Sequence, residues 1–386
     1  MQDSSPRTPA RRPGIAVGRV AGIPVHLNAS MILLAVLVTV LYGEFVQRQL
    51  DLVQPAGYAV GLGFVLCLLG SVLLHELGHA LTARRFGIGV RGITLELLGG
   101  YTEMDRDAPN ARVDLLVALA GPAVSLVLAL AAVLATAALP DRTVLNQVAF
   151  QLAVSNLLVA AFNVLPGLPL DGGRALRAGV WALTRDRHLG TEVAGWVGRA
   201  VAVGTAGLVA ALTVVGLLSP FGLALMLLVA LTLWQGAGQA IRVARISRRF
   251  PLVDLARLAR PIVAVPTGTP LAEAQRQAAV RVPGTDGSVV PLGVTDSTGR
   301  LVALVEPVAA GAVPPERRPW VSVDAVARTI DAVPRMPVGL SGEEVIEAVQ
   351  AHPGAQYVVT SGEDVLGVLR LADLAQLLEP KRKSRS

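Results

Sequence analysis

The sequence has few charged residues and almost no cysteine. Its single cysteine, Cys67, excludes a disulfide within the chain and a zinc cluster built on several cysteines. Asp, Glu, Lys and Arg make up only 16% of the 386 residues, whereas 53% are hydrophobic. The net charge of +6 is modest, and the arginines gather at the ends of apolar runs, which argues against nucleic acid as a partner. This composition is typical of a protein embedded in a lipid bilayer.

Six apolar runs are long enough to cross a bilayer, at about 17–25 residues each when their flanks are included. They lie at residues 31–45, 56–81, 113–139, 144–165, 201–218 and 221–240. The sequence therefore predicts an α-helical polytopic membrane protein with about six transmembrane helices. Residues 1–30 are polar and interrupted by proline, so we expect a cytoplasmic or interfacial segment there and no cleavable signal peptide.

Arginine is unevenly distributed between the two sets of loops that connect these runs. One set carries most of the arginines, whereas the opposite loops carry only Arg48 and Arg142. Under the positive-inside rule, the arginine-rich loops and both termini lie in the cytoplasm. We therefore expect a multi-pass protein of the cell membrane whose C-terminal part is cytoplasmic.

A histidine pair lies inside the second apolar run, in the motif His75-Glu76-Leu77-Gly78-His79. His75 and His79 are about one helical turn apart, so both imidazoles can bind one zinc ion. Glu76 lies beside them and can take a proton from water bound to the metal. In lipid, such polar side chains would each cost several kcal/mol without partners, which favours a zinc site over an incidental match.

The fourth apolar run ends in a polar segment, Asn163 to Gly173, whose prolines and glycines cannot continue a regular helix. Asp171 would lie at a depth similar to His79, and its carboxylate would complete a set of three ligands. Alternatively, Asp171 caps the helix that follows, which is a common role for aspartate and the one favoured for this residue taken alone. If Asp171 faces the two histidines, the ligand role is favoured. The amide of Asn163 either bonds the broken helix end or donates to the oxyanion of a reacting carbonyl.

Together, HELGH at His75 to His79, NVLPGLPLDGG at Asn163 to Gly173 and AGPAVS at Ala120 to Ser125 resemble one family. This is the site-2 protease family of intramembrane zinc metalloproteases, and the resemblance covers residues 31–246. It implies an endopeptidase that cleaves the transmembrane segments of membrane-tethered proteins. The implied roles are zinc ligand for His75, His79 and Asp171, general base for Glu76, and substrate or oxyanion contact for Asn163. Ser125 departs from the family, which often has asparagine there.

A segment between the second and third runs alternates like a half-buried strand. Ile93, Leu95 and Leu97 alternate with polar residues, and Gly99-Gly100 is typical of a turn. Residues 18–26 also predict a short strand at the membrane surface. The family resemblance implies that residues 87–105 form a sheet edge near the active site, which can bind an extended peptide by adding a strand. An ordinary interfacial hairpin is the alternative.

The composition changes after residue 246, where long apolar runs stop and a weak repeat begins. The copies, residues 251–308 and 323–378, both predict strand–helix–strand–strand and resemble a pair of CBS domains, a C-terminal α/β domain with a shared core. Such pairs often bind adenine nucleotides; Asp373 matches their acidic position, but Arg370 replaces the expected hydroxyl residue. The alternative is a structural lid that joins two chains into a homo-oligomer. Residues 379–386 form a basic tail.

Two classes of function fit these features. The first is a zinc endopeptidase whose partners are the lipid bilayer and a membrane-tethered protein substrate. The second is a zinc-binding membrane transporter or regulator that senses a ligand through its CBS pair. Transporters line a path with several ionisable groups, and the apolar runs here are nearly free of such groups outside the two metal motifs. The sequence therefore favours the protease.

Overall fold

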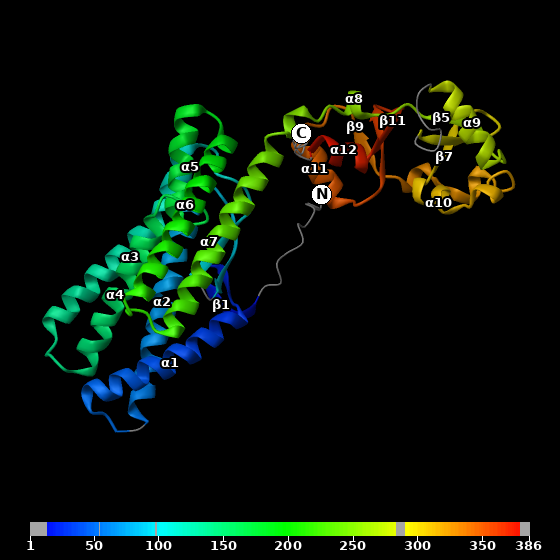
Figure 1. Cartoon of the computed structure of the whole chain (residues 1–386). Helices are drawn as coiled ribbons and strands as arrows, with labels where there is room; N and C mark the ends of the chain where they lie inside the picture. The colour runs from blue at the N-terminus through cyan, green and yellow to red at the C-terminus, as the bar shows by residue number, and fades with distance from the viewer. Residues whose placement is uncertain (1–13, 54, 97–98, 283–289, 379–386) are drawn as a thin grey trace. The chain divides into compact units, whose positions relative to one another are not determined.

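The structure is a computed structural model that describes residues 14–53, 55–96, 99–282 and 290–378. Within it, one compact unit ends at Arg245 and the other begins at Ile246 (Figure 1). The predicted basic tail at residues 379–386 lies outside the described residues, as do the first thirteen residues.

Six helices of the described chain are long and apolar enough to cross a membrane. They are α1 (Ala29–Leu50), α2 (Ala56–Arg85), α3 (Ala111–Ala138), α4 (Val144–Val164), α6 (Arg187–Val214) and α7 (Pro220–Ser247). Each corresponds to one predicted apolar run, so the predicted six transmembrane helices are confirmed. Several helices begin at polar caps: the side chains of Asn28, Asn110 and Asp186 accept backbone N–H groups at the starts of α1, α3 and α6.

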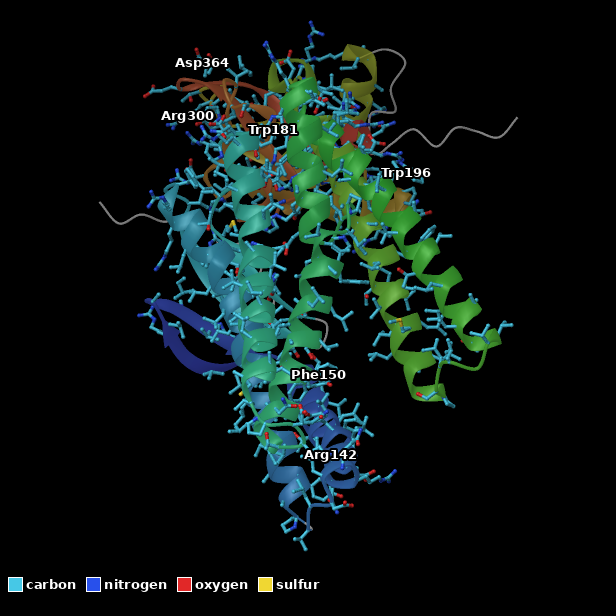
Figure 2. The ribbon with its side chains drawn as sticks, turned by 90° about the vertical axis from the view of Figure 1, so that its left-hand side faces the viewer. Arg142, Phe150, Trp181, Trp196, Arg300 and Asp364 are labelled. Atoms are coloured by element: carbon cyan, nitrogen blue, oxygen red, sulfur yellow. The ribbon has the colours of Figure 1, made fainter. Side chains whose placement is uncertain are left out.

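A seventh helix of this unit, α5 (Asp171–Thr184), is too short to span a bilayer. It packs against α3 and α6. Figure 2 shows Trp181 of α5 and Trp196 of α6 toward one end of the helical bundle, and Arg142 and Phe150 toward the other. The arginine-poor loop that contains Arg142 therefore lies at the opposite end of the bundle from α5.

A four-stranded sheet lies against α1 and α2, with the strand order β1-β2-β3-β4. The strands are β1 (Ile15–Val20), β2 (Ile23–Leu27), β3 (Val90–Glu96) and β4 (Gly99–Met104). Only β2 and β3 are parallel. Ile93 and Leu95 of β3 are buried against the helices, as their alternation predicts.

The antiparallel pairing of β3 with β4 confirms a chain reversal between them, but its predicted position at Gly99-Gly100 is wrong. Both glycines lie in β4, where they face Glu96 and Leu95 of β3 across the antiparallel ladder. Gly99 has a φ of 134°, which a residue with a side chain rarely adopts. A Cβ at Gly100 would lie 2.8 Å from Cγ of Glu76, so this glycine allows the strand to approach α2 closely.

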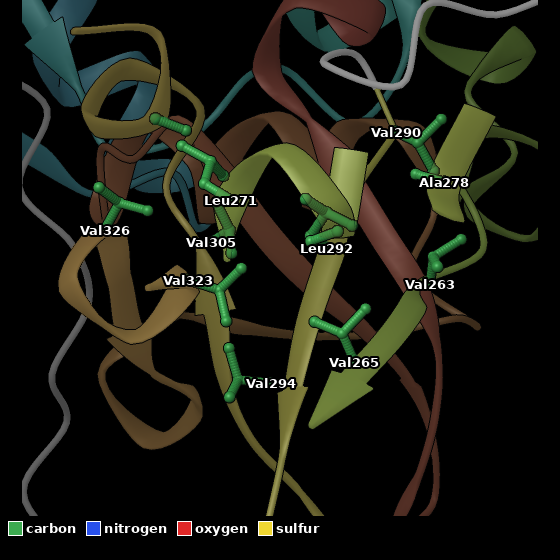
Figure 3. Close-up of a cluster of buried hydrophobic side chains, with 12 residues drawn as sticks. Val263, Val265, Leu271, Ala278, Val290, Leu292, Val294, Val305, Val323 and Val326 are labelled. Atoms are coloured by element: carbon green, nitrogen blue, oxygen red, sulfur yellow. The ribbon is translucent and has the colours of Figure 1, made fainter. Parts of the chain in front are cut away.

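The C-terminal unit contains two copies of the predicted order strand–helix–strand–strand, which is confirmed. The first copy has β5 (Val263–Pro266), α9 (Leu271–Arg281), β6 (Leu292–Thr295) and β7 (Leu301–Val305), followed by α10 (Pro307–Ala312). The second has β9 (Arg335–Pro337), α11 (Gly342–Ala351), β10 (Gln356–Ser361), β11 (Asp364–Arg370) and α12 (Leu371–Leu378). Figure 3 shows the valine-rich core of the first copy, formed by residues such as Val265, Leu271 and Val294.

Each copy is completed by the segment that precedes the other. Strand β8 (Ala327–Thr329), which leads into the second copy, pairs with β7 of the first. Conversely, Leu255 of α8 (Leu255–Leu258), which leads into the first copy, is buried in the core of the second. Arg260 also bridges to Val368 of β11. The two copies therefore depend on each other for their cores.

Candidate metal centre

Three donor atoms converge between α2 and α5. The Nε2 atoms of His75 and His79 are 3.3 Å apart. Oδ2 of Asp171 lies 3.2 Å from Nε2 of His75 and 3.1 Å from Nε2 of His79. The two histidines are only 5% and 3% exposed. The structure thus brings together the three residues that the sequence predicted as ligands.

The spacing of these atoms fits a zinc ion. Zinc binds nitrogen and oxygen donors at about 2.0–2.2 Å in tetrahedral geometry, which places neighbouring donors about 3.3–3.6 Å apart. The three observed separations, 3.1–3.3 Å, are close to this edge length. The three atoms form one group with metal-ligand chemistry among the described residues.

Helix α3 sets the orientation of both imidazole rings. Nδ1 of His79 lies 2.7 Å from the main-chain oxygen of Val117. Because a carbonyl only accepts hydrogen bonds, Nδ1 of His79 carries the proton. Its Nε2 atom therefore presents a lone pair toward the other two candidate metal ligands. Nδ1 of His75 lies 2.9 Å from Oγ of Ser125. Ser125, the residue that departs from the family pattern, therefore contacts a candidate ligand directly.

Gly121 of α3 provides the space in which an ion would lie. A Cβ at this position would be 2.3 Å from Nε2 of His79 and 2.6 Å from Nε2 of His75. Any side chain at this position would therefore displace the imidazoles or fill the centre of the donor set. This close approach explains why the Ala-Gly-Pro motif has glycine here.

Glu76 lies beside the metal ligands and contacts the edge strand β4. Its side chain is buried, and its Oε2 accepts a hydrogen bond of 2.9 Å from Oγ1 of Thr102. Thr102 was not identified from the sequence, because a threonine in a short alternating segment carries no signal of its own. The contact places the predicted sheet edge at the candidate base.

A buried ion pair joins α5 to α3. Asp114 of α3 is 1% exposed, and its two carboxylate oxygens accept hydrogen bonds of 2.6 and 2.9 Å from Arg177. Arg174 lies 3.9 Å from the same carboxylate. Both arginines follow Asp171 on α5 at intervals of three residues, so the pair fixes the helix that carries the third donor. The arginines at the ends of the apolar runs indicated the topology, but their pairing with Asp114 could not be predicted from the sequence.

A second pair lies outside the spans, in the loop before α3. Arg187 at the start of α6 donates a hydrogen bond to Asp107. This hydrogen bond, against the opposing effect of burial, lowers the pKa of the Asp107 carboxyl below its ordinary value. The loop is thereby tied to the beginning of α6.

The segment before Asp171 packs against two helices through glycines. Gly167 lies so close to Gly198 of α6 that a Cβ at position 167 would be 2.6 Å from its Cα. Pro169 lies against Gly236 of α7 in the same way. Helix α5 begins at Asp171, and no side chain caps its first turn. The alternative in which Asp171 acts as a cap is therefore wrong, because its carboxylate faces the histidines.

The other two candidate residues, Asn163 and Asp373, are not part of the group of three donors. Asn163 is half-buried in the last turn of α4, and among the described residues its amide has no hydrogen-bond partner. Asp373 lies in the C-terminal unit, where both carboxylate oxygens accept hydrogen bonds from Arg260 at 2.6 and 2.8 Å. Nucleotide binding at Asp373 stays a prediction.

Comparison with known proteins shows clear similarity. Residues 63–152 match the model of Peptidase family M50. Rip3 of Mycobacterium tuberculosis, provisionally named a zinc metalloprotease, is 33% identical over 96% of this chain and 94% of its own length. A Synechocystis protein with the same provisional name is 36% identical over 61% of this chain and 62% of its own. The site-2 protease of Methanocaldococcus jannaschii, a solved structure, has 26% identity and a TM-score of 0.42, covering 59% of this chain and 94% of that one.

The fold and the donor set define a membrane-embedded zinc metalloprotease. The relative that matches nearly the whole of both chains settles the family. The chain belongs to peptidase family M50, the site-2 protease family. The predicted multi-pass metalloendopeptidase is thereby confirmed, and family membership favours it over the transporter alternative.

Proposed function

We propose that this protein cleaves transmembrane segments of membrane-tethered proteins, with His75, His79 and Asp171 holding one zinc ion and Glu76 acting as general base. The observation that carries the proposal is the convergence of three donor atoms within 3.1–3.3 Å of one another, with Glu76 buried beside them. When bound, zinc would supply a Lewis acid that polarises the scissile carbonyl and acidifies water.

Glu76 moves the proton in this proposal. It accepts a proton from the attacking water and later donates it to the amide nitrogen, as the carbon–nitrogen bond breaks. The hydroxyl of Thr102 holds Oε2 of the carboxylate, which leaves Oε1 to exchange the proton. We further infer that the Asn163 amide donates to the oxyanion, in keeping with its lack of another partner among the described residues.

Strand β4 is the surface that we propose for the substrate. It is the edge of its sheet, and Thr102 at its centre bonds Glu76. A transmembrane helix hides its own peptide bonds, so a substrate must unwind locally before water can attack. Pairing with the outer edge of β4 would hold the unwound segment in extended form beside the base.

We infer that both termini and the C-terminal unit are cytoplasmic, because the arginine-poor loop with Arg142 lies at the bundle end opposite α5.

The topology of the C-terminal unit supports a CBS pair that regulates the protease or joins two chains. An adenine nucleotide at Asp373 would have to share its carboxylate with Arg260. The ion pair of Asp373 with Arg260 therefore favours a structural role of the C-terminal unit over nucleotide binding.

The test is replacement of Glu76 by glutamine in the purified full chain, incubated in proteoliposomes with a panel of single-span proteins. Glu76→Gln should keep its zinc and lose cleavage, measured by mass spectrometry of the products. Glu44→Gln is the matched control, because Glu44 is an exposed glutamate of α1 that pairs with Arg48 and belongs to no proposed site. Normal cleavage by Glu76→Gln would refute its role as the base.

A further inference from the structure

One arginine of the helical bundle is held between two tryptophan rings. The guanidinium carbon of Arg199 on α6 lies 5.0 Å from the ring centre of Trp196 and 4.7 Å from that of Trp234 on α7. Helix α7 passes so close at Gly238 that a Cβ there would be 3.2 Å from Nη2 of Arg199. The guanidinium plane is therefore fixed by both helices, with its charge stabilised by the faces of two rings.

No carboxylate in the described residues neutralises Arg199. Its Nε is buried and has no hydrogen-bond acceptor among those residues. The neighbouring acid, Glu192, is already paired with Arg245 at 2.7 Å. By contrast, Arg177 in the same bundle has a bidentate carboxylate partner. A fixed guanidinium that no carboxylate neutralises attracts an anion.

The position of this site along the helices indicates where the anion comes from. The apolar run of α6 begins at Val201, two residues after Arg199, and Trp234 lies inside the apolar run of α7, six residues before its end at Ala240. Arg199 and Trp196 therefore lie just before the apolar run of α6, and Trp234 of α7 extends the site into the lipid-facing part of the bundle. Trp196 and Trp234 are 49% and 44% exposed, so this surface is open. Tryptophan and arginine at such a boundary face lipid headgroups.

We propose that Arg199, Trp196 and Trp234 form a binding site for the phosphate of an anionic phospholipid. The planar guanidinium donates to two phosphate oxygens at once, and the indole rings pack against the glycerol and the first methylenes of the acyl chains. The site adjoins the segment that carries Asp171: Gly198, next to Arg199, contacts Leu168, and Gly236, near Trp234, contacts Pro169. A bound lipid would press α6 and α7 together on this segment.

The test measures lipid binding to the delipidated full chain by native mass spectrometry. Arg199→Gln is compared with Arg242→Gln, which removes the same charge from an exposed residue of α7. Phosphatidylglycerol, phosphatidylcholine and inorganic phosphate are titrated separately. We expect phosphatidylglycerol to bind the wild type and Arg242→Gln equally, and Arg199→Gln at least about tenfold more weakly. Phosphatidylcholine should bind all three proteins weakly.

A second variant protects the test against a folding defect. Arg199→Lys keeps the charge but loses the planar fork, so we expect binding between the wild type and Arg199→Gln. Equal loss of affinity in Arg199→Gln and Arg242→Gln would show general electrostatic attraction and overturn the proposal. So would unchanged binding by both Arg199 variants. Competition by inorganic phosphate as strong as that by the lipid would assign the site to the free anion and contradict the lipid assignment.

Discussion

At the scale of single residues, the metal centre depends on groups that touch the ligands without being ligands. The carbonyl of Val117 selects the tautomer of His79, and Ser125 contacts the ring of His75. Gly121 leaves the centre of the donor set open. Such outer contacts typically change metal affinity or activity by about 10–100-fold when they are removed. Three positions on one face of α3 therefore decide how well His75 and His79 bind.

Replacement of Gly121 by alanine should weaken zinc binding strongly. The new methyl group would lie 2.3 Å from Nε2 of His79, so the ring must move out of its place. We expect a loss of at least about tenfold in zinc affinity, measured by competition with a chelator. Gly70→Ala, in the same helix as the histidines, is the control, because a Cβ at that position would have no neighbouring atom within 4 Å. Wild-type zinc affinity in Gly121→Ala would contradict the geometry of the centre.

At the scale of elements, α3 and α5 act together as the frame of the site. Helix α3 orients the two histidines of α2, while the pair of Asp114 with Arg177 holds α5 and therefore Asp171. A buried ion pair contributes little net stability over an apolar pair, but removal of one partner leaves a buried charge. The pair is thus best understood as a device that fixes the relative position of two helices.

Asp114→Asn should both destabilise the protein and weaken its zinc site. Arg177 would then lack a charged partner, which typically costs about 3–5 kcal/mol. We expect a lower thermal midpoint in detergent together with reduced zinc content, whereas Asp141→Asn, in the exposed loop between α3 and α4, should change neither. A variant with a normal midpoint and full zinc content would show that the ion pair does not position α5.

Hydrophobic runs and the two metal motifs predicted the long helices and the three converging donors. They succeeded because a span needs many apolar residues and a metal site in lipid needs several polar ones. The turn was predicted at the wrong position, Gly99-Gly100, because glycine is typical both of turns and of close approaches between backbone and side chains. Thr102 and the carbonyl of Val117 could not be predicted, since their roles depend on contacts between elements distant in the chain. The pairing of β8 with β7 and the burial of Leu255 in the second copy also depend on contacts between segments far apart in the chain.

At the scale of the whole molecule, a membrane-spanning unit and an α/β unit are joined in one chain. The similarity to Rip3 runs through both units, so the combination is common to the two proteins. In the C-terminal unit, the core of each copy includes residues from the segment before the other. The unit should therefore fold as one cooperative whole.

A chain that ends at Val308 should lose the fold of its remaining copy. It would lack β8, the partner of β7, and Leu255 would have no core to enter. We expect residues 251–308 to be cleaved by a soluble protease at least about tenfold faster than in the full chain. A chain ending at Leu378 serves as the control and should resist cleavage. Equal resistance of both truncated chains would show that the first copy folds alone.

The most direct measurement is the zinc content and X-ray absorption spectrum of the purified protein. The wild type and Glu76→Gln should each hold one zinc ion bound only by nitrogen and oxygen donors at about 2.0–2.2 Å, with no sulfur. Asp171→Ala should lose most of this zinc while its helices remain folded. A full complement of zinc in Asp171→Ala, or no zinc in the wild type, would contradict the joint role of His75, His79 and Asp171.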